Sequence, residues 1–226
     1  GRDIMLHQRT GRQLLSQYGY FFVLWFVIQV FINVPIMNLT SGWTEELLTD
    51  AVKMLIWLGV GFFMIFHTKK DQFEVERPFQ LNLKFKPLYV TLAAILVYML
   101  ASAFIQRHSI SVVASFKPTM LLQDFLIVGL CEETVFRGYL LNRLRKIVPT
   151  EQSALIIQAV LFALIHLPKY LTTYPALSLI TIMGQLVTVA ILGYLFGWLF
   201  LKSRSLWPSI IVHSVWDLLI VLLIGS

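Results

Sequence analysis

The sequence predicts an all-α fold: a polytopic bundle of about seven transmembrane helices with a cytoplasmic N-terminus. Hydrophobic residues make up 58% of the 226 residues and charged residues only 13%, whereas ordinary globular domains have about 45–50% and about 25%. The mean hydropathy is +0.76, and apolar stretches long enough to cross a bilayer follow one another along the chain. This composition excludes a disordered chain, and we expect no nucleic-acid partner despite the net charge of +6.

Seven apolar stretches predict the seven helices, and segments rich in turn-forming or charged residues separate them. In chain order they cover residues 18–37, 47–66, 88–105, 120–141, 152–167, 177–201 and 207–224. The first stretch follows a basic segment and no signal-peptide cleavage site follows it, so we expect a retained helix. We treat residues 1–226 as one integral membrane domain, in which the first three helices carry no recognisable motif.

The distribution of basic residues predicts the orientation. A cytoplasmic N-terminus would place thirteen of the 18 Lys and Arg residues on inner segments and only three on outer ones, as the positive-inside rule requires. Short loops between helices are typical of a prokaryotic cell membrane protein, which is the location we expect. The single cysteine, Cys131, excludes both an intrachain disulfide and a cysteine-based zinc site.

The fourth stretch, residues 120–141, carries charges that the bilayer should exclude. Its ten Leu, Ile, Val and Phe residues favour insertion by about 3–6 kcal/mol in total. Glu132, Glu133 and Arg137 each oppose it by about 2.5–3.5 kcal/mol. Because these contributions at best cancel, this helix needs partners inside a bundle or a wet cavity.

Helical spacing predicts different roles for these three charged residues. Glu133 and Arg137 are four residues apart and share a face, so we expect an ion pair between them. Glu132 projects about 100° away and is expected to be free for chemistry. The alternative to a catalytic role is that the ion pair only packs the helix and that the carboxyl of Glu132 faces a water pocket. Ionisable groups inside a membrane are, however, functional candidates by default.

Two later stretches add polar groups. The fifth ends with Phe162-Ala-Leu-Ile-His166, and the seventh contains His213-Ser-Val-Trp-Asp217, in which the histidine and the aspartate share a face. A lone helical histidine is more often a packing residue. Two histidines with a free glutamate and an aspartate are a rarer set, which contains a general base and groups able to polarise a carbonyl.

The sixth stretch contains Gly193-Tyr-Leu-Phe-Gly197. This Gly-x-x-x-Gly pattern permits two helices to approach closely. We expect it to serve packing within the bundle rather than dimerisation.

At these residues the sequence resembles the CAAX prenyl protease family, also called the Abi or CPBP family of intramembrane proteases, of the type II CAAX endopeptidase kind. The family carries Glu-Glu-x-x-x-Arg, Phe-x-x-x-His and His-x-x-x-Asn/Asp on successive or later transmembrane helices. Here the motifs are Glu132-Glu133-Thr-Val-Phe-Arg137 and the two motifs that end in His166 and Asp217, and they span about residues 120–220. Each is a weak pattern alone, and the three together are a strong one.

The resemblance implies a glutamate protease with its active site inside the bilayer. Glu132 would activate a water with help from His166, while His213 and Asp217 would lie at the substrate carbonyl. The supporting residues would be Glu133, Arg137 and Phe162. An ionised aspartate would repel an oxyanion, so Asp217 is either protonated or orients His213.

The resemblance also bears on cofactors and partners. The metal-free glutamate mechanism is favoured and no cofactor is expected, whereas the alternative is a zinc ion held by Glu132, His166 and His213. The expected partners are the lipid bilayer and a membrane-associated peptide or protein substrate, lipidated in CAAX-type reactions. Peptide maturation and bacteriocin self-immunity are the roles that bacterial members suggest. Two other functions remain open: a non-proteolytic membrane scaffold or immunity protein of the same family, and a small proton-coupled transporter.

Overall fold

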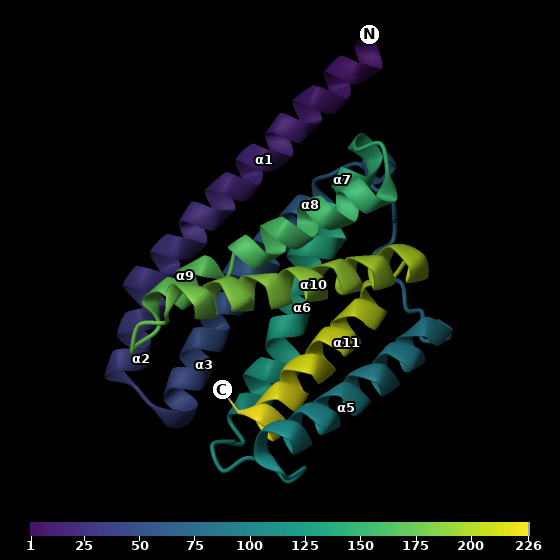
Figure 1. Ribbon diagram of the computed structural model, residues 1–226. Helices are drawn as coiled ribbons and strands as arrows, with labels where there is room; N and C mark the ends of the chain where they lie inside the picture. Colours follow the sequence, from purple (N-terminus) through teal and green to yellow (C-terminus); the bar gives the residue numbers. More distant parts are fainter. Residues whose placement is uncertain (226) are drawn as a thin grey trace.

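The structure, a computed structural model, describes residues 1–225 and consists of helices joined by turns and loops (Figure 1). No β-strand occurs within that range. The all-α fold predicted from the composition is therefore confirmed. In the same residues, six helical segments are long and apolar enough to cross a membrane: Arg2–Leu39, Gly42–Phe66, Lys86–Arg107, Glu151–Thr172, Leu179–Ser203 and Leu206–Ile224.

Short π-helical turns, labelled η, interrupt several of these segments without ending them. The elements are α1 (Arg2–Ile28), η1 (Gln29–Asn33), α2 (Val34–Leu39), α3 (Gly42–Lys53), η2 (Met54–Leu58), α4 (Gly59–Phe66), the 3₁₀ turn η3 (Lys70–Gln72), α5 (Lys86–Arg107), η4 (Leu121–Ile127), α6 (Val128–Glu133), η5 (Thr134–Leu141), α7 (Asn142–Ile147), α8 (Glu151–Leu164), α9 (Leu167–Thr172), α10 (Leu179–Ser203), α11 (Leu206–Leu219) and η6 (Ile220–Ile224). Single π-turns of this kind occur often at functional sites.

The fourth predicted span is a continuous helix from η4 to α7, but it is not among the six apolar ones. Asp124, Glu132, Glu133 and Arg137 make it too charged. The seven spans are therefore not confirmed, and the cytoplasmic N-terminus stays a prediction. Every residue from 131 to 144 is buried, so the part of this helix that carries Glu132, Glu133 and Arg137 lies inside the bundle, as these charges require.

The other helices expose much of their apolar surface. In their most apolar windows only 17–44% of the residues are buried inside the protein. A soluble protein rarely leaves such continuous apolar surface in contact with water. The outer faces are therefore suited to lipid, and the chain is an integral membrane protein.

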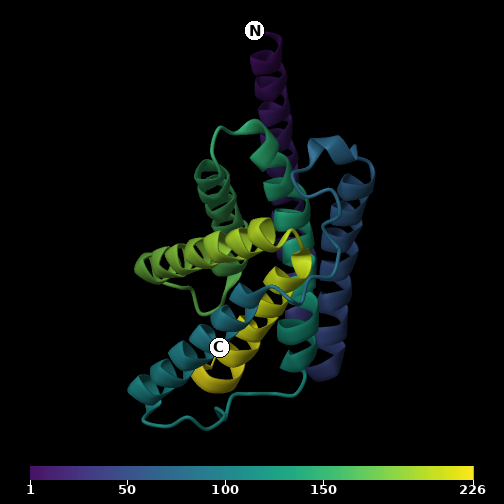
Figure 2. The same cartoon turned by 90° about the vertical axis from the view of Figure 1, so that its right-hand side faces the viewer.

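Glycines bring the central helix and its neighbours close together. A Cβ on Gly129 of α6 would lie 2.5 Å from Ser214 Oγ of α11, and Figure 2 shows α11 between the central helix and α5. A Cβ on Gly193 would lie 2.8 Å from the Phe162 ring, and one on Gly197 would lie 2.7 Å from the side chain of Gln158. The Gly-x-x-x-Gly pattern thus serves close packing of α10 against α8, as predicted.

The loop after α4 is fastened to the central helix. Asn142 accepts a hydrogen bond from the Val75 amide at 2.6 Å and donates one to the Val75 carbonyl at 2.8 Å. The buried amide of Asn142 therefore replaces a backbone partner for this loop. This attachment keeps the loop beside the end of η5, where it lines a polar cavity described below.

Candidate active site

Glu132, the first of the two central glutamates, lies between two basic side chains. It is only 3% exposed. Its Oε2 accepts a hydrogen bond from Lys53 Nζ at 2.8 Å, and its Oε1 lies 3.3 Å from His166 Nε2. The contact with His166 is the one that the resemblance implies, whereas the contact with Lys53 was not expected from the sequence. Lys53 is the last residue of α3. Residue spacing along the central helix does not predict which residues of another helix contact Glu132.

His166 follows α8, and its ring is held by the backbone of that helix. Nδ1 lies 2.7 Å from the carbonyl oxygen of Phe162. Because a carbonyl oxygen only accepts, Nδ1 carries a proton, and a neutral ring would present the lone pair of Nε2 to Glu132. A single proton between Nε2 and Oε1 would serve both atoms. This is the arrangement of a general acid–base pair.

Glu133 and Arg137 form the ion pair that their spacing predicts. Arg137 Nε lies 3.2 Å from Glu133 Oε1, and both side chains are fully buried. The guanidinium also lies over two aromatic rings, 4.1 Å from the centre of Phe162 and 5.3 Å from that of Phe196. Buried cations gain from such ring faces. Arg137 is therefore held by one carboxylate and two π-faces.

His213 is held on three sides. Its Nδ1 lies 3.1 Å from Glu133 Oε2, and its Nε2 lies 3.3 Å from Asp217 Oδ2. Phe196 stacks on the ring at 4.6 Å and 15°. Since ionised carboxylates only accept, the arrangement suits an imidazolium that donates from both nitrogens. Asp217 thus lies where it can orient His213, which is one of the two alternatives expected for this aspartate.

Phe162 connects the two groups of charges. Its ring centre is 5.0 Å from that of His166 and 6.1 Å from that of His213, edge-on to both, and the Arg137 guanidinium lies on its face. The side chain is 2% exposed. All seven residues predicted for the site are therefore gathered in one region, in which only His166 and Asp217 are partly exposed. They form two networks joined through Phe162 and through the adjacent glutamates.

The alternative zinc set does not converge. Of its three members only Glu132 and His166 contact one another, because His213 directs its nitrogens to Glu133 and Asp217. Within residues 1–225 no three or more His, Cys, Asp and Glu side chains are grouped to hold a metal ion. The donors therefore do not fit a zinc centre in this arrangement, and the chemistry below is derived from protein groups.

Two members of the site were missed from the sequence. Lys53 Nζ lies 4.6 Å from the ring centre of Trp57 and 5.6 Å from that of Trp25, so aromatic faces hold the lysine beside Glu132. Phe196 covers His213 and Arg137. A lysine within the second apolar stretch was a usable signal, whereas nothing distinguishes Phe196 among the phenylalanines of the chain.

Comparison with known families gives one match. Residues 114–219 match the family model described as "Type II CAAX prenyl endopeptidase Rce1-like". All seven predicted site residues lie inside the matched segment, and Lys53 lies outside it. Searches of curated proteins and of solved structures found no match.

Proposed function

Because residues 114–219 are a type II CAAX prenyl endopeptidase Rce1-like domain, we propose that the chain is an intramembrane endopeptidase in which Glu132 and His166 activate a water. The observation that carries the proposal is the contact between Oε1 and Nε2, 3.3 Å apart with Nδ1 tied to a carbonyl oxygen. A buried carboxylate and an imidazole that share room for one proton are suited to general-base catalysis.

In the proposed reaction, the water oxygen attacks the carbonyl carbon of a peptide bond while one water proton passes to the pair of Glu132 and His166. The tetrahedral intermediate carries its negative charge on the former carbonyl oxygen. When it collapses, the C–N bond breaks, and the same pair returns the proton to the leaving nitrogen. The products are a carboxylic acid and an amine, so atoms and charge balance.

The other residues take supporting roles in this proposal. His213 Nε2 is the donor for the oxyanion, and Asp217, whose side chain is 22% exposed, turns aside to release it. Glu133 contacts Nδ1 of His213, and Arg137 holds Glu133 in place. Lys53 positions Glu132 and keeps it ionised.

The substrate that we propose is a membrane-associated peptide or protein. The matched description names a CAAX prenyl endopeptidase, and the burial of the site among apolar helices favours a substrate that is already in the membrane. No cofactor is required by the proposed steps.

The test is Glu132→Gln, which preserves shape and removes the base. We expect cleavage to fall by at least about 10²-fold, measured by mass spectrometry of membrane peptides from cells that make either protein. Glu151→Gln is the matched control, because Glu151 lies at a half-exposed ion pair with Lys202. Thermal unfolding in detergent verifies that both variants fold.

Each competing function predicts a different result for cleavage, biological activity or uptake. Wild-type cleavage by the Glu132→Gln protein would overturn the proposed mechanism. Full biological activity of that variant, without any change in peptide mass, would indicate a scaffold. Substrate-linked uptake into proteoliposomes without cleavage would indicate a transporter.

A further inference from the structure

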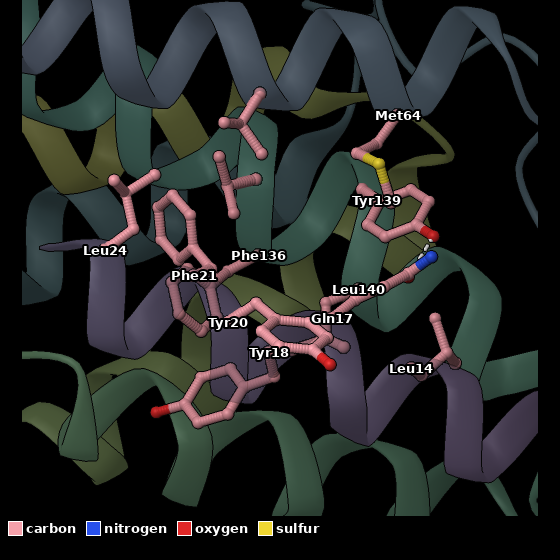
Figure 3. Close-up of a pocket in the computed structure, with 12 residues that line it drawn as sticks. Leu14, Gln17, Tyr18, Tyr20, Phe21, Leu24, Met64, Phe136, Tyr139 and Leu140 are labelled. Atoms are coloured by element: carbon pink, nitrogen blue, oxygen red, sulfur yellow. Dashed lines mark hydrogen bonds between the residues drawn. The ribbon is translucent and has the colours of Figure 1, made fainter.

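An apolar cavity lies between α1, α4 and η5, and none of the seven predicted site residues lines it (Figure 3). Its volume is about 260 Å³. Aliphatic and aromatic side chains from all three elements form its walls, among them Leu14, Phe21, Leu24, Val60, Phe136 and Leu140. A cavity of this lining suits an alkyl chain.

A polar cavity of about 410 Å³ continues from one end of the apolar one. The two share Gln17, Met64 and Tyr139 as lining residues. At this border the Tyr139 hydroxyl donates to the Gln17 side chain (Figure 3). The polar cavity is also lined by three basic residues, His67, Lys69 and Arg143. A single molecule that fills both cavities would have an apolar tail and an anionic head.

Arg143 is the residue that points to an anion. It is 6% exposed, yet its hydrogen bonds go only to neutral oxygens: the Tyr139 hydroxyl at 3.2 Å and the Gln72 side chain at 3.0 Å. Its Nε has no partner. Within residues 1–225 no carboxylate comes within 4.0 Å of the guanidinium, in contrast to Arg137.

A buried cation without an anion is costly, and a phosphate is a good partner for the planar donors of a guanidinium. We propose that the two cavities together bind one anionic phospholipid, with its phosphate at Arg143 and an acyl chain between α1 and α4. Lys69, which is exposed at the rim, adds a second positive charge. The site is separate from the proposed peptidase chemistry and does not depend on it.

The test is lipid binding by the purified full chain in a neutral detergent, measured by native mass spectrometry. The probes are dioleoyl phosphatidylglycerol, dioleoyl phosphatidylcholine and inorganic phosphate. We expect one phosphatidylglycerol to be retained in preference to phosphatidylcholine, and about tenfold weaker binding by Arg143→Gln, since a charge-assisted hydrogen bond is lost. Val60→Phe, which fills the apolar cavity, is expected to weaken the same binding.

Arg145→Gln is the matched control, because Arg145 is on the same helix and lines neither cavity; we expect it to bind the lipid like the wild type. If Arg143→Gln does not fold, Lys69→Gln tests the same charge dependence at an exposed position. Equal retention of both lipids, or unchanged binding by the charge variants, would overturn the proposal. Inorganic phosphate that displaces the lipid at equal concentration would also overturn it, because the acyl chain would then contribute nothing.

Discussion

Replacement of Lys53 by Met removes the cation beside Glu132 and keeps most of the side-chain volume. Lys53 is 16% exposed and Glu132 is 3% exposed, with 2.8 Å between their charged atoms. Removal of one partner from a buried pair costs about 3–5 kcal/mol, because the other charge is left buried. Since His166 still contacts Glu132 at 3.3 Å, we expect the lower end, about 3 kcal/mol.

The measurement is a double-mutant cycle of the free energy of unfolding, by denaturant titration in mixed micelles. The cycle consists of the wild type, Lys53→Met, Glu132→Gln and the double variant. We expect a coupling energy of about 2–3 kcal/mol, because the double variant buries neither charge. Lys202→Met is the control: its pair with Glu151 is 47% and 36% exposed, so its loss should cost about 0–1 kcal/mol.

Additive losses, within about 0.5 kcal/mol, would refute the reasoning, since contact between the two residues would then have no energetic consequence. The same variants also separate positioning from stability. Lys53→Met is expected to slow peptide cleavage, and Lys53→Arg to restore part of it, at protein levels corrected for folding. A purely structural lysine would leave the rate per folded molecule unchanged.

Two further substitutions test the packing of the central helix by the same titration. Arg137→Met should destabilise by about 3–5 kcal/mol, because Glu133 stays fully buried without its cation; a loss below about 1 kcal/mol would contradict the pairing. Gly129→Ala should cost about 1–3 kcal/mol, since its Cβ would lie 2.5 Å from Ser214 Oγ. Gly184→Ala, with open space around the new Cβ, should be neutral or stabilising, and equal effects at the two glycines would show that this close approach is absent.

Contacts along one helix could be predicted from residue spacing, whereas contacts between helices could not, and only the family resemblance implied that Glu132 and His166 meet. The pair Glu133–Arg137 and the contact His213–Asp217 both follow from a spacing of four residues. The bond from Lys53 to Glu132 joins residues 79 positions apart. Helical periodicity fixes which face a side chain occupies, but it does not say which other helix lies opposite that face.

The limits of the helices were also only partly predictable. Hydropathy places the first span at residues 18–37, whereas the helical segment is Arg2–Leu39. Hydropathy identifies only the part of a helix that is apolar enough to contact lipid. The helix itself can extend into polar residues, because its ends are set by where the backbone hydrogen bonds stop. The central helix is not among the six apolar segments because of its charges, and hydropathy takes no account of the ion pairs and burial that offset those charges.

The charges of the site explain why two adjacent glutamates can both lie in the interior. Three acidic and three basic side chains pair there in two groups, Lys53 with Glu132, and Arg137 and His213 with Glu133 and Asp217. With His213 as an imidazolium this set is neutral, which lowers the cost of burial. A neutral His166 would direct the lone pair of Nε2 at an ionised oxygen of Glu132. Nε2 of His166 and Oε1 of Glu132 would then repel each other as two acceptors. A proton between them removes this repulsion, so proton uptake stabilises the pair. The base in the proposed reaction is therefore the pair rather than Glu132 alone, and Lys53, from outside the matched domain, completes the neutral set.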